Sequence, residues 1–136
     1  MSAYTASWTG AGQLGELLLP SPDDVLVHLD LHPGNALRAN GGWKAIDPHG
    51  ARADRHAEIW ALICPEAPAL PDDPVDAKRS PRHRLELYSE AAGLDADRAA
   101  AWTRVRASAE AVSPDVDGDP GWAERLRRTA RALSPD

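Results

Sequence analysis

The chain has little of what marks several common protein classes. Cys64 is its single cysteine, so no disulfide forms within the chain, and Lys44 and Lys78 are the only lysines among its 136 residues. The longest apolar runs, such as Leu17–Leu19, are far too short to cross a bilayer. The net charge is -6, whereas a nucleic-acid partner favours a basic face. We therefore expect no membrane and no nucleic-acid partner. No charged leader followed by an apolar core opens the chain, which favours a cytoplasmic location.

Two short segments carry nearly all the side chains that suggest chemistry. Residues 28–35 read His-Leu-Asp-Leu-His-Pro-Gly-Asn, and residues 43–48 read Trp-Lys-Ala-Ile-Asp-Pro. An Asp and an Asn five positions apart on one loop, followed by a second Asp after a short apolar run, is the layout that ATP-dependent phosphoryl transfer to a hydroxyl needs. In this layout Asp30 takes the proton of the acceptor hydroxyl, while Asn35 and Asp47 offer hard oxygen ligands to Mg²⁺.

The stretch from Val25 to about Trp60 resembles the aminoglycoside phosphotransferase family, and more narrowly its antibiotic kinases of the streptomycin and hydroxyurea type. Members share the protein-kinase fold and usually show His-Gly-Asp-Leu-His-x-Gly-Asn, then an apolar strand that ends in Asp-Pro. The positions that match this pattern are His28, Asp30, Leu31, His32, Gly34, Asn35, Asp47 and Pro48. The resemblance implies ATP and Mg²⁺ as cofactors and a small-molecule hydroxyl as the acceptor. It implies that Asp30 is the catalytic residue, that Asn35, Asp47 and His32 bind the cofactor, and that Asn35 and Asp47 hold the metal.

The chain departs from the family pattern at two positions. Leu29 stands where the family usually has glycine, a residue used where the backbone adopts a positive φ or packs closely. If the family's glycine has that role, the catalytic loop is distorted here. Glu58 stands where an Asp-x-x-x-Asp pattern starting at Asp54 would place a shorter carboxylate. Both departures bear on whether the loop holds Asp30 correctly.

The resembled fold has a second lobe that we do not find in this sequence. Its glycine-rich loop and its nucleotide-binding lysine precede the catalytic loop, yet no lysine or arginine precedes Arg38. We therefore expect one domain over residues 1–136, of class α+β and mostly α, equivalent to the C-terminal lobe of a protein-kinase-like fold. Because catalysis of this type depends on positioning, such a chain alone should turn over ATP negligibly. Two alternatives stay open: the chain complements a separate small-lobe polypeptide, or it is a truncated, non-catalytic kinase remnant whose exposed apolar surface favours self-association.

Local signals divide the chain into four parts: a lead-in over 1–24, a catalytic segment over 25–64, a proline-rich linker over 65–79 and a helical subdomain over 80–136. Gly10 to Gly15 fits the phosphate-binding string G-x-G-x-x-G, but Pro20 and Pro22 follow too closely, which favours a short helix ending near Leu19. The linker could instead be a polyproline peptide that docks on an SH3-like domain.

The catalytic segment predicts a strand over Val25–Val27 and a hairpin joining 35–38 to 42–46 through Asn40-Gly41. Such a hairpin brings Asn35 and Asp47 together at its open end. Asp54 can cap a helix that runs through Ile63. Ser80, Asp95 and Asp119 are predicted caps of three further helices. Their predicted core stripes are Trp102, Val105, Ala109 and Val112 in one helix, and Trp122, Leu126, Ala130 and Leu133 in the last.

A rival interpretation uses some of the same residues. His28, Asp30 and His32 alternate along the chain, so on an extended strand they would share one side and, with Asp47 or His49, could bind zinc or manganese in a hydrolase. This hypothesis gives no role to Asn35, and Pro33-Gly34 interrupts the strand at once. The sequence leaves the acceptor open among an aminoglycoside, a hydroxyurea-like compound, a sugar and another small alcohol.

Overall fold

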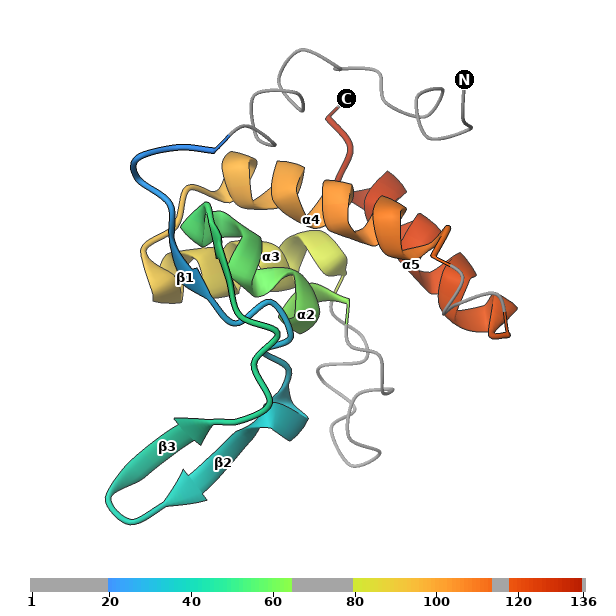
Figure 1. The fold of residues 1–136 in the computed structure, drawn as a ribbon. Coiled ribbons are helices and arrows are strands. Elements are labelled where there is room, and N and C mark those ends of the chain that lie inside the picture. The colour runs from blue at the N-terminus through green and yellow to red at the C-terminus, as the bar shows by residue number, and fades with distance from the viewer. Residues whose placement is uncertain (1–19, 65–79, 114–117, 136) are drawn as a thin grey trace.

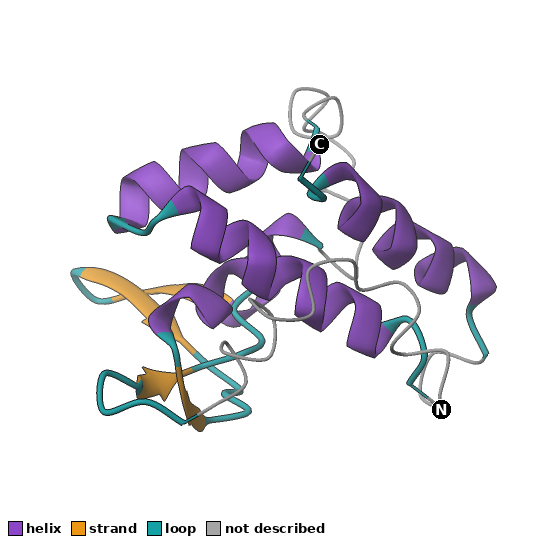
Figure 2. Cartoon of the chain, turned by 90° about the horizontal axis from the view of Figure 1, so that it is seen from above, coloured by secondary structure: helices purple, strands orange, loops and turns teal. Residues whose placement is uncertain are grey.

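The structure is a computed structural model that describes residues 20–64, 80–113 and 118–135. Its helices form the body of the molecule, and two small antiparallel sheets lie at one side of that body (Figures 1 and 2). The expected α+β class with a mainly helical content is confirmed. The proposed helix ending near Leu19 and the proline-rich linker over 65–79 lie outside the described residues. Within the described ranges, no helix has the length and apolar character needed to span a membrane.

The predicted helix caps of the helical subdomain are confirmed. Each of the three cap side chains accepts a hydrogen bond from a backbone N–H three positions ahead, which satisfies a donor that the first helical turn leaves unpaired. Gly93 ends the first of these helices in the left-handed conformation, with φ 65, as glycine does readily. The helices with their caps are α3 (Pro81–Ala92) with Ser80, α4 (Ala96–Glu110) with Asp95, and α5 (Pro120–Ala132) with Asp119.

The helix predicted after Asp54 forms in two parts. Residues Arg55–Ile59 make a 3-10 helix, η2, and Trp60–Ile63 continue it as the short α-helix α2. Both parts pack between the longer helices, and their apolar side chains belong to two neighbouring core clusters. One cluster gathers Trp60, Ala61, Cys64, Ala107, Ala111, Trp122, Ala123 and Leu126, and the other gathers Ile59, Ile63, Leu85, Ala99, Ala100 and Leu133.

The predicted core stripe of α4 is partly wrong. Val112 is 52% exposed, Ala109 is only half-buried, and the buried side of α4 instead carries small residues. These small residues are Ala99, Ala100, Thr103 and Ala107, together with Val105. Because α4 packs against η2, α2, α3 and α5, small side chains let the neighbouring backbones approach closely. The stripe predicted for α5 is confirmed, since Trp122, Leu126 and Leu133 are buried and Ala130 packs against them.

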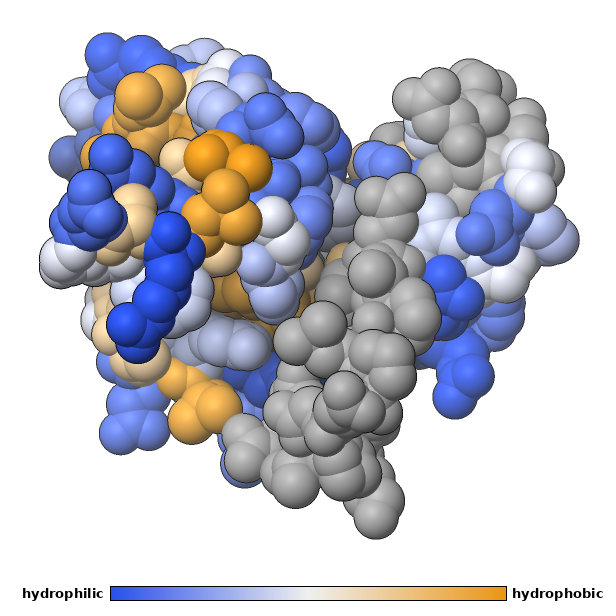
Figure 3. All heavy atoms as spheres, turned by 90° about the horizontal axis from the view of Figure 1, so that it is seen from below, coloured by the Kyte–Doolittle hydropathy of each residue, from blue (hydrophilic) through white to orange (hydrophobic). Residues whose placement is uncertain are grey.

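The strands form two separate pairs. β1 (Val25–Val27) pairs with β4 (Ala51–Ala53), and β2 (Ala36–Ala39) pairs with β3 (Gly42–Ala45) in the hairpin that the sequence predicts. The hairpin extends away from the helices, as Figure 1 shows. Its apolar side chains are consequently exposed, with Leu37 at 46%, Trp43 at 68% and Ile46 at 36%. Figure 3 views the molecule from below, the side towards which the hairpin extends in Figure 1, and shows apolar side chains among hydrophilic ones.

Asp54 connects the end of β4 to the start of α4. One of its carboxylate oxygens accepts hydrogen bonds from the His56 amide at 2.9 Å and the His56 ring at 2.6 Å, and the other accepts from the Arg98 side chain. Burial by itself would raise the pKa of Asp54, but these hydrogen bonds favour the carboxylate and lower its pKa from 3.8 to about 2. The other His56 ring nitrogen accepts the Asp95 amide at 3.1 Å, which ties the cap of α4 to the same network.

This network predicts a loss of stability in acid. The folded-state pKa of Asp54 lies below its ordinary value, so its contribution is complete above about pH 4 and is lost as the pH falls towards 2. The side chain is only 13% exposed, and the difference corresponds to roughly 2 kcal/mol of unfolding free energy. Urea unfolding across this pH range should show the loss, and Asp54→Asn should remove most of it. Asp97→Asn, at an exposed position of α4, is the matched control; an equal effect there would contradict the assignment.

Candidate active site

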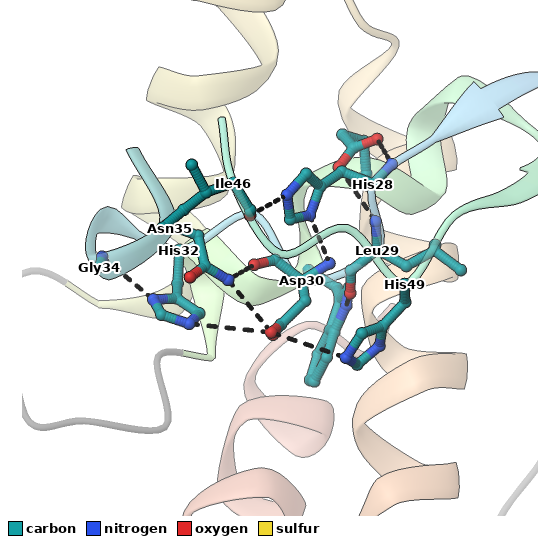
Figure 4. A network of polar contacts seen from close by, with 10 residues as sticks. His28, Leu29, Asp30, His32, Gly34, Asn35, Ile46 and His49 are labelled. Atoms are coloured by element: carbon teal, nitrogen blue, oxygen red, sulfur yellow. Dashed lines mark hydrogen bonds and ion pairs between the residues drawn. The ribbon is translucent and has the colours of Figure 1, made fainter. Parts of the chain in front are cut away.

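The loop that follows β1 is held by a carboxylate from η2. Glu58 accepts the His28 amide at 2.6 Å through one oxygen and the Leu29 amide at 3.2 Å through the other. The Trp60 indole N–H donates to the Leu29 carbonyl at 2.6 Å. Three hydrogen bonds from residues about thirty positions away therefore fix the backbone immediately before Asp30 (Figure 4).

Leu29 itself adopts the left-handed conformation, with φ 66. This conformation costs a residue with a Cβ roughly 1–2 kcal/mol, because the Cβ approaches the following carbonyl oxygen. The sequence raised the possibility of a distorted loop at this position. The structure instead forms the left-handed turn with leucine in place, and the hydrogen bonds from Glu58 and Trp60 stabilise it. Glu58, the second departure from the family pattern, thus has a defined structural role.

His28 is a structural residue of this loop. Its Nε2 donates to the Ile46 carbonyl at 2.7 Å, and its Nδ1 accepts the Asp30 amide at 3.2 Å. Both ring nitrogens are therefore engaged with backbone groups and neither is open to a metal ion. In the part of the chain that the structure describes, no group of three or more His, Cys, Asp or Glu side chains could hold a metal. The geometry gives the zinc or manganese hydrolase hypothesis no support.

Asp30 and Asn35 meet in the centre of the loop. The Asn35 side-chain amide nitrogen donates to the Asp30 carbonyl at 2.9 Å and to the Asp30 carboxylate at 3.3 Å. These bonds orient the amide so that its oxygen points away from Asp30 (Figure 4). Asn35 is only 7% exposed, and its oxygen is a hard ligand of the kind Mg²⁺ prefers. The donor chemistry therefore fits the metal role expected of this residue.

Two imidazole rings flank the Asp30 carboxylate. The Nε2 atoms of His32 and His49 lie 3.8 and 3.7 Å from its Oδ2. His32 also accepts the Gly34 amide through Nδ1 at 3.1 Å, and a Cβ at Gly34 would lie 2.9 Å from the His32 ring. A side chain at position 34 would therefore displace the His32 ring. His32 contacts Asp30 directly, and its expected cofactor-binding role stays a prediction.

The sequence predicted a role for His49 only as a possible zinc or manganese ligand. Its position beside Asp30 was not predicted. The His49 amide donates to the His28 carbonyl at 3.0 Å, which joins the segment after Asp47 to the catalytic loop. The only signal in the sequence was its position two residues beyond Asp47, and such a position does not specify a contact with residue 30.

Asp47 lies just beyond the hairpin, in a left-handed backbone conformation with φ 52. The adjacent Ile46 amide donates to the Asn35 carbonyl at 3.0 Å, so the open end of the hairpin brings the two segments together as expected. The Asp47 side chain is exposed and makes no hydrogen bond or ion pair with the described residues. The meeting of Asp30, Asn35 and Asp47 around one cation stays a prediction.

Comparisons with known proteins agree on one family. A family model described as aminoglycoside/hydroxyurea antibiotic resistance kinase matches residues 3–118. The chain is 38% identical over 120 residues to a streptomycin 6-kinase of Streptomyces glaucescens, covering 85% of the chain and 38% of the relative. It is 34% identical over 115 residues to a hydroxyurea phosphotransferase of Kitasatospora aureofaciens, covering 82% of the chain and 31% of that relative.

The chain thus spans less than half the length of these curated relatives. No solved structure matches it.

Proposed function

Because this chain belongs to the aminoglycoside/hydroxyurea antibiotic resistance kinase family, we propose that it carries the catalytic centre of a phosphotransferase that acts on a small-molecule hydroxyl. The observation that supports this most directly is the contact between Asp30 and Asn35, which joins the two side chains that the resemblance assigns to proton transfer and to metal binding. The acceptors named for the relatives, streptomycin and hydroxyurea, are the first candidates.

Asp30 has the position that a catalytic base needs. Its carboxylate accepts a hydrogen bond from the Asn35 side chain and lies beside two histidine rings, a position from which it can orient the acceptor hydroxyl and take its proton. The Asn35 oxygen and the free Asp47 carboxylate are the residues that would hold Mg²⁺. When bound, ATP with Mg²⁺ would supply the phosphoryl group and neutralise the charge on its oxygens.

We further propose that the chain is equivalent to the C-terminal lobe of a kinase-like fold and works together with a small lobe. Two regions of exposed apolar residues support a missing partner: Leu37, Trp43 and Ile46 on and beside the hairpin, and Val25 and Leu26 on β1. A two-stranded hairpin is marginally stable alone in water, so one that extends from the body gains from a covering partner. Self-association through the same residues is the competing possibility.

The test compares the chain alone with the same residues extended to the full length of the relatives. We expect ATP-dependent phosphorylation of streptomycin or hydroxyurea by the extended protein and negligible turnover by the chain alone, because positioning of the nucleotide supplies most of the rate. Adding a separate small-lobe polypeptide to the chain should restore part of the activity. Sedimentation of the chain at several concentrations detects self-association. An extended protein that is inactive on a broad panel of alcohols would contradict the proposal.

A further inference from the structure

Three nitrogen atoms converge on one oxygen of the Asp30 carboxylate. The Asn35 side-chain amide donates to Oδ2 at 3.3 Å, and the Nε2 atoms of His32 and His49 lie 3.8 and 3.7 Å from that same atom. The two rings approach it from opposite sides (Figure 4). None of the described residues donates to the other oxygen, Oδ1. The two oxygens therefore differ, and Oδ1 is the one open to an incoming proton.

The position of the His49 ring beside Asp30 is set by the backbone around it. The His49 and Gly50 amides both donate to the His28 carbonyl, at 3.0 and 3.4 Å. Gly50 has a φ of 64, a left-handed conformation that glycine adopts readily. The segment that follows Asp47 is thus tied to the backbone that enters the catalytic loop, so the His49 side chain starts from a fixed point.

The two rings differ in how freely they can move. His32 accepts the Gly34 amide through Nδ1, so the proton of its neutral ring lies on Nε2, and its side chain is 31% exposed. The His49 ring makes no hydrogen bond with the described residues, and its side chain is 60% exposed. His49 can therefore turn about its own side-chain bonds, whereas His32 is held.

Only a small movement separates the His49 ring from a hydrogen bond with Asp30. Such a bond spans about 2.7–3.2 Å between nitrogen and oxygen, so the ring Nε2 is too far from Oδ2 by roughly 0.5–1 Å. Catalytic hydrogen bonds are often this long in a protein without its substrate and shorten when the substrate binds. Rotation of the exposed His49 ring can supply this movement while its backbone stays in place.

We infer that His49 is a positioning residue: its Nε2 donates to Asp30 Oδ2 when the acceptor is bound, which keeps Oδ1 turned towards the acceptor hydroxyl. This inference rests on the proposed function. The hydroxyl proton then passes to Oδ1, while the hydroxyl oxygen bonds to the γ-phosphorus of ATP and ADP leaves with the electron pair of the broken bond. His49 neither gives nor takes a proton in this step. It contributes by orienting the carboxylate.

Kinetics of the extended protein test whether His49 acts as a donor. His49→Ala should lower kcat about tenfold, the effect of losing one hydrogen bond to a charged group. The KM values for ATP and the acceptor should stay within about twofold, because the ring contacts the base and neither substrate. His49→Gln, whose amide N–H can reach the same oxygen, should restore most of kcat. His83→Ala, at an exposed position of α3, is the matched control and should leave kcat unchanged.

Three kinetic results would overturn the inference: an unchanged kcat in His49→Ala, a rise in KM alone, or a His49→Gln variant no more active than His49→Ala. The last result would show that the ring fills space but does not act as a donor.

A second measurement needs no phosphotransfer. In the 136-residue chain, NMR couplings of the Asp30 β protons report whether its side chain keeps one rotamer. We expect one rotamer in the unaltered chain and in His49→Gln, and averaging in His49→Ala, because the ring confines the carboxylate. Averaging in the unaltered chain, or one rotamer in all three, would refute the positioning role. If the rotamer depends on His49 as expected but the extended protein phosphorylates no alcohol, the proposed function fails while the positioning of Asp30 stands.

Discussion

Replacing Asp30 with asparagine is expected to lower phosphotransfer by the extended protein by about 10²–10⁴-fold, the range typical for loss of a general base. Asparagine keeps the shape of the side chain but cannot accept a proton. The fold should be little affected, because the Asn35 amide also donates to the Asp30 backbone carbonyl, which the substitution leaves in place. The loss should therefore fall on kcat, measured by release of ADP in the presence of the acceptor.

Asp23→Asn is the matched control for this substitution. Asp23 is an exposed aspartate in the turn before β1, so the same chemical change there should leave kcat intact. Nucleotide affinity gives a second check, because Asp30 is assigned to the acceptor and not to ATP. Full activity in Asp30→Asn would show that another group receives the proton, and His49, 3.7 Å from the same carboxylate oxygen, would then need to be examined.

Replacing Glu58 with glutamine is expected to lower the unfolding free energy by about 2 kcal/mol. The carboxylate accepts two successive amides, from His28 and Leu29. Glutamine retains one acceptor and turns an N–H group towards the other amide, so a part-buried donor loses its partner. The left-handed conformation of Leu29 then also loses a hydrogen bond that stabilises it. Urea unfolding measures the change as a lower midpoint with an unchanged slope.

Two further variants separate the hydrogen bonds from general effects. Glu86→Gln, at an exposed position of α3, should change stability by less than about 0.5 kcal/mol. Combining Glu58→Gln with Leu29→Gly should recover part of the loss, because glycine adopts a positive φ without a Cβ clash. A double variant no more stable than Glu58→Gln alone would show that the strain at Leu29 is not what Glu58 opposes.

Several parts of the fold were accessible from the sequence because their causes lie within a few residues. The caps at Ser80, Asp95 and Asp119 each satisfy an amide three positions ahead, and Asn40-Gly41 closes a hairpin between its own two strands. The buried face of α4 was not accessible in the same way. The periodicity of large apolar residues predicted one buried side, whereas the side of α4 that packs closely against other helices carries mainly alanines. The spacing of apolar residues within a helix does not specify which other elements pack against it.

The candidate site shows the same division. Asp30, Asn35 and Asp47 could be predicted as a set because their signals lie close together in the chain, and that set stays a prediction. The family could be predicted because the residues around them resemble its motif, and the family is confirmed. The carboxylate of Glu58 that fixes the loop, the Trp60 indole beside it, and His49 against Asp30 were decided by tertiary structure. The contacts of Glu58 and Trp60 join residues about thirty positions apart, and only the packing of η2 and α2 against β1 and its following loop brings them within hydrogen-bonding distance. His49 comes to lie beside Asp30 because the segment between β3 and β4 returns to the loop, where the His49 amide donates to the His28 carbonyl.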